Sequence, residues 1–278
     1  MEIIPDIISS RQNSIVKWVA SLSDKKGRSE SRSFIAEGYK LCFEAAESNM
    51  PVTHIFLSES CDDKVASKIK RAYDRDIYKK TKLIVLSSEA FEKISTEKAP
   101  QGVLIVIKYL DFFSELDIIY KEDFFLSENE KAVSLYSVRD PGNLGAIIRS
   151  AVAFGFEHVI MSSDCADIYN SKTVRSAMGS VFKIKATVVK DFSSFVNSAK
   201  LNGRRVLAAE LSDDAVALSD CRLNKSDIIV IGNEGHGISD EISRSCSESV
   251  FIPISDSIES LNASVAASIL LWEQSKTL

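Results

Sequence analysis

The chain has 278 residues, of which 45% are hydrophobic, so it can bury a large core and is expected to form two domains. No stretch approaches the roughly 20 apolar residues of a membrane-spanning helix, and the first residues do not resemble a secretory signal. We therefore expect a cytoplasmic protein without a membrane partner. Five scattered cysteines without a CxxC pair and three histidines without ligand spacing indicate neither a disulfide framework nor a metal site.

The net charge of −5 is unevenly distributed along the chain. Residues 1–110 carry 18 Lys and Arg against 15 Asp and Glu, which leaves 16 against 24 for residues 111–278. One basic group surrounds Gly27, and a second covers residues 79–82. Either group is suited to contact phosphates, although a solvated surface explains them equally well. The candidate RNA contacts of the first group are Lys25, Lys26, Arg28 and Arg32.

The N-terminal part shows an alternating α/β pattern. Its periodicity predicts helices over 13–22, 37–48 and 63–75, and strands over 52–58, 82–87 and 102–108. This pattern ends near Lys108, so we expect a smaller α/β domain over residues 1–108. Residues 109–130 mix aromatic and acidic residues without alternation and are predicted to form a connector.

A second α/β unit is predicted over residues 131–278. Strands are expected over 133–138, 156–162, 204–211, 227–232 and 249–254, with helices over 144–155 and 171–178. Short apolar strands separated by helices predict a largely parallel sheet covered on both faces.

The first polar loop of this unit lies in RDPGNLGAIIRSA (139–151). Pro141 and Gly142 favour a turn, and Asn143 is suited to cap the following helix. The apolar side chains of that helix share one face, from which Arg149 points away. Arg149 is therefore either an ordinary surface arginine or a cation above the strand ends, where α/β sheets place their ligands.

The second loop lies in VIGNEGHGIS (230–239). Its glycines match no nucleotide fingerprint, and Glu234 would repel phosphate. They either let the backbone approach a neutral or cationic ligand closely or form a sharp strand-to-helix turn.

The third segment, residues 250–273, contains Leu261, Val265, Ile269 and Trp272 at helical spacing, a stripe that we expect to face the core. Polar side chains and exposed backbone N–H groups meet at the helix start, at Ser260 and Asn262. No spacing indicates a nucleophilic hydrolase.

These three segments resemble, in order and spacing, the signature motifs of the SpoU/TrmH family of the SPOUT superfamily, which are S-adenosylmethionine-dependent RNA 2′-O-ribose methyltransferases. The N-terminal part is similar to the substrate-binding domain of rRNA-type members at residues 34–48 and 100–108. The resemblance implies a SPOUT domain with a deep trefoil knot. It also implies a homodimer with its sites at the subunit interface.

The resemblance also implies site residues. The cofactor pocket would be lined by Gly232, Ile252, Leu261 and Asn262. The catalytic set would comprise Asn143, Arg149, Glu234, Ser260 and Asn262. Because an arginine is rarely deprotonated, we expect Arg149 to bind the phosphate beside the target ribose and to stabilise developing alkoxide, with Asn143 and Glu234 orienting it. Arg175 is a further candidate RNA contact.

Alternatives remain at the level of substrate and class. The N-terminal domain favours rRNA by family analogy, and tRNA is the rival substrate. A noncatalytic RNA-binding ribosome-assembly factor would explain the basic residues, and a Rossmann-type nucleotide enzyme would explain the strands and glycine loops. Binding of S-adenosylmethionine separates both alternatives from the methyltransferase hypothesis.

Overall fold

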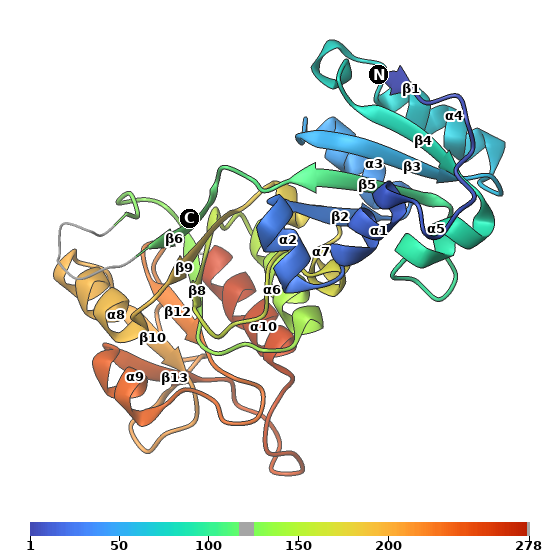
Figure 1. The fold of residues 1–278 in the computed structure, drawn as a ribbon. Helices are drawn as coiled ribbons and strands as arrows, with labels where there is room; N and C mark the ends of the chain where they lie inside the picture. Colours follow the sequence, from blue (N-terminus) through green and yellow to red (C-terminus); the bar gives the residue numbers. More distant parts are fainter. Residues whose placement is uncertain (117–124, 277–278) are drawn as a thin grey trace. The chain divides into compact units, whose positions relative to one another are not determined.

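The computed structural model describes residues 1–116 and 125–276, which divide into two compact units (Figure 1). The first unit combines Met1–Leu110 with Asp167–Phe182, and the second combines Asp111–Ala166 with Lys183–Leu278. The α/β class expected from the sequence is confirmed. The inclusion of Asp167–Phe182 in the first unit was not foreseen, because the sequence assigned residues 131–278 to one domain.

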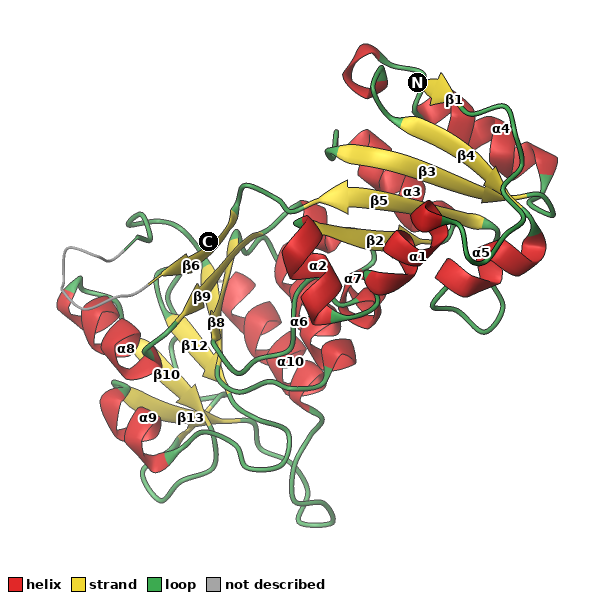
Figure 2. Cartoon of the chain, in the orientation of Figure 1, coloured by secondary structure: helices red, strands yellow, loops and turns green. Residues whose placement is uncertain are grey.

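The first unit is built on a five-stranded mixed sheet in the order β1-β4-β3-β5-β2 (Figure 2). β4 pairs in parallel with β1 and β3, whereas β5 is antiparallel to β3 and β2. Its strands are β1 (Glu2–Ile3), β2 (Ser33–Glu37), β3 (Val52–Ser58), β4 (Lys82–Leu86) and β5 (Val103–Lys108). Its helices are α1 (Ser14–Ser21), α2 (Lys25–Ser31), α3 (Tyr39–Glu47), α4 (Asp63–Ala72), α5 (Ser88–Ile94) and α7 (Ser171–Ala177), with short 3₁₀ turns η1 (Asp76–Tyr78) and η3 (Ser180–Phe182).

Helix α1 and α5 pack together on one face of this sheet. Val16 and Val19 of α1 and Phe91 of α5 join a buried cluster with Phe56 and Val106 of the strands. Side-chain caps begin these helices, since the Asn13 side chain accepts from the Ile15 N–H and the Ser87 hydroxyl from the Ala90 N–H.

The segment Asp167–Phe182 is held in the first unit by buried contacts. Tyr169 stacks between Phe34 and Tyr109, and its hydroxyl accepts a hydrogen bond from the Leu110 N–H at 2.9 Å. The carboxylate of Asp167 binds the Arg28 guanidinium, with Nη2 to Oδ2 at 2.6 Å. Because the Tyr169 contact is buried and the Arg28–Asp167 contact is partly buried, this segment is an integral part of the first unit.

The second unit contains an eight-stranded sheet in the order β11-β13-β10-β12-β7-β8-β9-β6, in which every described pair is parallel. Its strands are β6 (Phe113–Leu116), β7 (Ala132–Leu135), β8 (His158–Ser162), β9 (Lys185–Val189), β10 (Val206–Ala209), β11 (Val216–Ala217), β12 (Ile228–Ile231) and β13 (Glu248–Phe251). Its helices are α6 (Pro141–Ala153), α8 (Phe192–Leu201), α9 (Asp240–Ser245) and α10 (Ala263–Ser275). The predicted parallel sheet is thus confirmed. The predicted connector is not featureless, since it contributes β6; its residues 117–124 lie outside the described residues.

Both faces of the parallel sheet are covered, as predicted. Phe192, Phe195 and Val196 of α8 and Ile242 of α9 pack on one set of alternating strand residues. α6 and α10 pack against each other, with the Ser150 and Ser268 hydroxyls 2.7 Å apart, and α10 also contacts β12. The carboxyl ends of the parallel strands all lie at one edge of the sheet.

The expected core stripe of α10 is wrong. Val265 is 47% exposed and Trp272 is 50% exposed, while Ala267, Leu270 and Leu271 are buried. The helix is apolar on more than one side, so its periodicity did not define a single inward face. An apolar surface, which we call the α10 face (Val265 and Trp272, with partly exposed Leu261 and Ile269), stays partly exposed among the described residues, with the Lys276 ammonium 3.6 Å from the Trp272 ring centre.

Candidate active site

The three motif loops converge at the carboxyl edge of the parallel sheet. The first follows β7, the second follows β12, and the third follows β13. β7 and β12 are direct neighbours, and β13 is separated from β12 only by β10. Loops at this edge form the ligand sites of open α/β sheets. The sheet topology therefore brings the first motif to the second and the third, with Asn143 lying 91 residues before Glu234 and 119 residues before Asn262.

A chain of side-chain hydrogen bonds joins the three loops. The Asn262 amide nitrogen donates to the Asn143 amide oxygen at 3.0 Å, and the Asn143 nitrogen donates to Oε1 of Glu234 at 2.9 Å. Each residue comes from a different motif, so Asn143 is the link between the other two. Three of the five residues expected to act in catalysis are thus in contact.

The carboxylate of Glu234 is held in its ionised form. Partial burial raises its pKa, but hydrogen bonds from Asn143 and from the backbone N–H groups of Glu234, Asp140 and Arg139 outweigh this effect and leave the pKa below its ordinary value. Oε1 accepts from the Asp140 N–H at 3.2 Å and Oε2 from the Arg139 N–H at 3.3 Å. A carboxylate stabilised in this way is a weak base, so Glu234 is suited to orient the loops rather than to remove a proton.

Asn143 does not cap helix α6, contrary to the expectation from the sequence. The capping residue is Asp140, whose carboxylate accepts from the Asn143 N–H at 2.9 Å, and Pro141 occupies the first helical position. Because Asp140 caps the helix, the Asn143 side chain is free to bridge the motifs. Asn262, in contrast, both bridges and caps, since its oxygen accepts from the Ser264 N–H at 2.9 Å at the start of α10.

The second loop is a tight structure closed on itself. Asn233 and Gly237 exchange backbone hydrogen bonds of 2.9 and 3.0 Å. The side-chain oxygen of Asn233 accepts hydrogen bonds from the backbone N–H groups of Gly235 and His236. A Cβ atom at Gly232 would lie 2.5 Å from the Gly237 carbonyl carbon, and Gly237 has a positive φ of 65°. The loop's own packing therefore requires glycine at both positions, and this requirement accounts for them without reference to a ligand.

A second carboxylate at this edge was not identified from the sequence. Asp164 accepts hydrogen bonds from the hydroxyls of Ser137 and Ser162 at 2.5 and 2.6 Å and from Nη2 of Arg139 at 3.0 Å. Ser137 has a positive φ of 58°, and its carbonyl accepts from the Asn233 amide at 2.7 Å. Asp164 thus supports the strained turn that connects β7 to the first motif. Its sequence context, a serine-rich stretch after a buried strand, gives only a weak signal.

Arg149 and Ser260 take no part in the hydrogen-bonded chain Asn262–Asn143–Glu234. Both are exposed, and within residues 1–116 and 125–276 neither side chain has a hydrogen bond or an ion pair. Arg149 lies in α6 one position before Ser150, which contacts α10. The expected orientation of Arg149 by Asn143 and Glu234 is therefore not seen within one chain.

The candidate cofactor residues lie at the same edge. Gly232 follows β12, Ile252 follows β13, and Leu261 precedes α10; all three are partly exposed. Leu211, two residues beyond β10, is 79% exposed at the same edge of the sheet. Partly exposed apolar side chains and loop backbone beside the anionic Glu234 fit a cofactor with an adenosine portion and a cationic sulfonium.

The candidate RNA contacts differ from one another. Lys25 and Lys26 are exposed on α2, and the Arg32 guanidinium lies 4.9 Å from the ring centre of Tyr109. Arg175 is half-exposed and forms an ion pair with Glu97.

The expectation for Arg28 is corrected. Its side chain is only 2% exposed, and besides Asp167 its Nη1 donates to the carbonyls of Leu22 and Ser23 at 3.0 and 2.7 Å. Arg28 is a structural residue of the first unit, with its donors committed to the protein.

The family-model comparisons agree with the motif analysis. Residues 130–272, just over half of the chain, match the SpoU rRNA Methylase family. The chain belongs to this family. Residues 13–105 match the MRM3-like substrate binding domain, so the SpoU domain follows a domain of substrate-binding type. The family resemblance found in the sequence is confirmed.

Relatives of this SpoU family member cover nearly the whole chain. It is 29% identical over 265 residues, 95% of this chain and 97% of the relative, to 23S rRNA (guanosine(2553)-2′-O)-methyltransferase RlmP of Bacillus subtilis. It is 27% identical over 272 residues, 96% and 90% of the two chains, to 23S rRNA (uridine(2479)-2′-O)-methyltransferase of Streptomyces viridochromogenes. The structure resembles that of the AdoMet-bound rRNA methyltransferase of Sinorhizobium meliloti with a TM-score of 0.83 and 27% identity, covering 99% and 98% of the chains.

Two other features of the SpoU chain bear on its class. None of the helices in residues 1–116 and 125–276 combines the length and apolar character needed to cross a bilayer. Within the same residues, no three acidic, histidine or cysteine side chains are grouped to hold a metal ion.

Proposed function

We propose that the protein transfers a methyl group from S-adenosylmethionine to a ribose 2′-hydroxyl of rRNA. The observation that carries this proposal is the hydrogen-bonded chain Asn262–Asn143–Glu234, which joins the three motifs at the carboxyl edge of the sheet. The RlmP relative, named as a 23S rRNA 2′-O-methyltransferase, supports both the reaction and the substrate. A structural relative named as AdoMet-bound supports the cofactor.

The cofactor is expected to lie against the three loops. Gly232, Ile252 and Leu261 would line its pocket, together with Leu211 and the Asn262 side chain. When bound, S-adenosylmethionine supplies an electrophilic methyl group on a sulfonium, which the ribose 2′-oxygen attacks. The ionised Glu234 adds a favourable charge for that cation.

The protein must also position the ribose and handle the hydroxyl proton. Ser260 is exposed next to the Asn262 bridge and is suited to hold the ribose. Arg149 carries an exposed guanidinium that is not ion-paired with any residue the structure describes, and it is suited to bind the phosphate beside the target nucleotide and to stabilise developing negative charge on oxygen. Because Glu234 is a weak base and guanidinium groups are poor proton acceptors in proteins, we assign proton removal to that phosphate or to water.

We further propose that the functional unit is a homodimer formed through the α10 face. Val265 and Trp272 expose about half of their surface on this face, which is an unusual arrangement for large apolar side chains of one helix. Arg149 lies on α6, which packs against α10, so we expect a second copy on the α10 face to approach the helix that carries Arg149. A trefoil knot in the SPOUT domain and a cytoplasmic location complete the proposal.

A labelling experiment tests the reaction and the substrate class together. Labelled S-adenosylmethionine is incubated with unmodified rRNA and unmodified tRNA in separate reactions, with wild-type protein and with Arg149→Lys. We expect label in rRNA alone and a large loss of turnover in Arg149→Lys, because lysine cannot bind a phosphate through two parallel hydrogen bonds. Label in tRNA alone would correct the substrate, and turnover near the wild-type value in Arg149→Lys would contradict the role given to Arg149.

The noncatalytic alternative is separated by cofactor binding. A ribosome-assembly factor without activity would bind RNA but need not bind S-adenosylmethionine, so absence of cofactor binding by calorimetry would contradict the enzyme proposal.

A further inference from the structure

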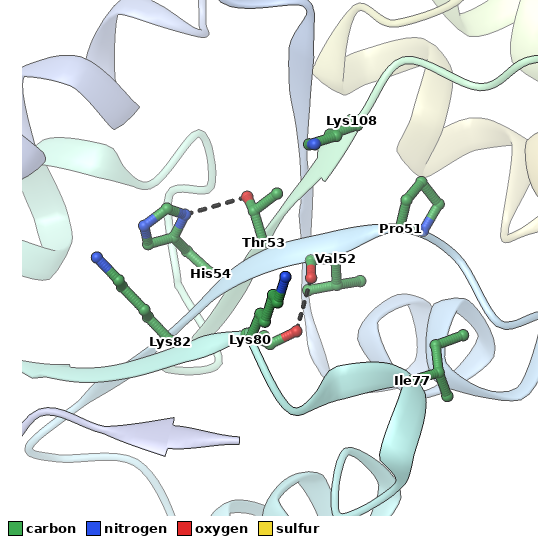
Figure 3. Close-up of a pocket in the computed structure, with 9 residues that line it drawn as sticks. Pro51, Val52, Thr53, His54, Ile77, Lys80, Lys82 and Lys108 are labelled. Carbon is green, nitrogen blue, oxygen red and sulfur yellow. Dashed lines mark hydrogen bonds between the residues drawn. The ribbon is translucent and has the colours of Figure 1, made fainter.

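A pocket of about 270 Å³ opens on the first unit, where β3 and β4 begin and β5 ends (Figure 3). Lys80 lies two residues before β4, Lys82 is the first residue of β4, and Lys108 is the last residue of β5. His54 and Thr53 of β3 form its inner wall between these lysines (Figure 3). We call this site the lysine pocket. It is remote in sequence from the three motifs.

The lysine pocket concentrates unpaired positive charge. Lys80, Lys82 and Lys108 are all exposed, and none pairs with a carboxylate in the described parts of the chain. The adjacent Lys79, in contrast, is bound to Asp76 at 3.0 Å. Glu2 of β1 is the cross-strand neighbour of Lys82 but forms no ion pair with it in the described residues. The three neighbouring cations outnumber this carboxylate and create a local positive potential, which attracts an anionic ligand.

The remaining polar groups of the pocket are already used within the protein. The Thr81 hydroxyl donates to the Val52 carbonyl at 2.7 Å, and the Thr53 hydroxyl donates to the Val106 carbonyl at 3.3 Å. His54 contacts Thr53 through Nδ1 and lies edge-on to Trp18 with ring centres 5.0 Å apart. Burial, followed by the charge of Lys82, lowers the pKa of His54, so this side chain adds no positive charge at neutral pH.

This combination suits a polyanion better than a small metabolite. A small anion is usually recognised by several fixed, buried donors, whereas this pocket offers mobile lysines around an open depression. Contacts of that kind position a nucleic-acid backbone without reading its sequence. Pro51 and the 53% exposed Ile77 at the rim add apolar surface next to the charges, against which a ribose can pack.

We propose that the lysine pocket binds consecutive phosphates of the RNA substrate. The proposal rests on the RNA methyltransferase function and adds to it the surface by which the first unit holds the RNA. All the pocket residues except Lys108 fall within the matched substrate-binding domain, residues 13–105.

The test replaces the three lysines together by glutamine, as Lys80→Gln, Lys82→Gln and Lys108→Gln. A matched triple variant, Lys64→Gln, Lys70→Gln and Lys93→Gln, removes the same charge from exposed lysines that do not line the pocket. Binding of an unmodified rRNA fragment is measured by fluorescence anisotropy without cofactor, over a series of salt concentrations. Because all six changes are on exposed side chains, both variants should keep the wild-type melting temperature.

We expect the pocket variant to bind RNA at least about tenfold more weakly at 0.1 M salt and its plot of log affinity against log salt to become shallower by about 2, because up to three phosphate contacts are lost. The matched variant should change both quantities much less. Equal effects of the two variants would overturn the proposal. So would a result in which the pocket lysines bind inorganic phosphate tightly and RNA does not displace it.

The same samples separate this proposal from the assigned activity. If the wild-type protein methylates rRNA and the pocket variant keeps full RNA affinity, RNA binding by the lysine pocket is contradicted, whereas the methyltransferase activity is not. Lysine-dependent RNA binding without methyl transfer would support the pocket and contradict the activity.

Discussion

At the scale of single residues, Asn143 connects the three motifs of the candidate site. Its amide donates to Glu234 and accepts from Asn262, so both of its polar atoms are engaged by different motifs. We expect this bridge to depend on the charge of the side chain at position 143 more than on its size. Replacing the amide by a carboxylate keeps the shape but puts two carboxylates at hydrogen-bond distance.

We therefore predict that Asn143→Asp lowers the rate of methyl transfer by about 10²-fold at pH 8, since the donor to Glu234 is lost and like charges repel. The two carboxylates would share one proton with a raised pKa, so the activity of the variant should recover toward pH 6. Single-turnover transfer across this pH range is the measurement. A variant whose rate loss is independent of pH would contradict the proposed charge effect.

A buried network in the second unit predicts a pH dependence of stability. Glu130, with 7% of its side chain exposed, accepts from Lys185 at 2.9 Å and from His158 at 3.2 Å. Burial raises the pKa of Glu130, but hydrogen bonds from Lys185, the Ser127 backbone and His158 outweigh it and lower the pKa from 4.5 to about 2. A carboxyl group whose pKa falls on folding stabilises the protein above its unfolded pKa and loses this contribution as the pH falls toward the folded value.

Wild-type protein should accordingly lose this contribution between pH 4.5 and about 2. Urea unfolding of wild type and Glu130→Gln at pH 7 and pH 3 measures it. The difference in unfolding free energy between the two proteins should shrink by about 2 kcal/mol at the lower pH. A difference that stays constant with pH would show that Glu130 acts through packing alone.

The sequence pattern predicted the residues of the candidate site better than it predicted which side chains are buried. Asn143, Glu234 and Asn262 were found because their loops carry glycine, proline and polar residues at strand ends. Arg28 was misplaced, because a run of basic residues does not show that one of them is buried against Asp167, located 139 positions away. Asp164 was missed for the same reason, since its partners are assembled only by the sheet.

At the scale of elements, the regular strands and helices were predicted best. Strand β3 was predicted over 52–58 and forms over Val52–Ser58, because its apolar run is bounded by polar residues. Helices α2, α5, α8 and α9 were not predicted; three of them have only six or seven residues, and such a length carries little periodicity. Helix α10 was predicted with the wrong face inward, because its apolar residues surround more than one side.

The exposed α10 face leads to a prediction about assembly. Val265→Glu combined with Trp272→Glu should convert a dimer into a monomer of 30.7 kDa, because each substitution puts a charge into the proposed apolar interface. Sedimentation of the two proteins measures their masses. Leu201 is the last residue of α8 and is 64% exposed. Leu201→Glu is therefore the matched control and should leave the dimer intact. A wild-type protein that sediments as a monomer at micromolar concentration would contradict the dimer.

At the scale of the whole molecule, the boundaries of the two family matches and of the two compact units differ in one segment. The SpoU match runs continuously over residues 130–272, yet Asp167–Phe182 belongs to the compact unit that contains the substrate-binding match. The sequence could not predict this arrangement, because the contacts of Tyr169 and Asp167 are made with residues more than 55 positions away. The chain therefore passes between the two units at three points along its sequence, after Leu110, Ala166 and Phe182.

The measurement that most directly tests the proposed function is the position of the transferred methyl group. Unmodified rRNA labelled by the wild-type protein is hydrolysed in alkali, which cleaves after every nucleotide that has a free 2′-hydroxyl. We predict that the label is recovered in an alkali-resistant dinucleotide, because a 2′-O-methyl group blocks cleavage at that position. Recovery of the label in single nucleotides would place the methyl group on a base and would contradict the proposed ribose methylation.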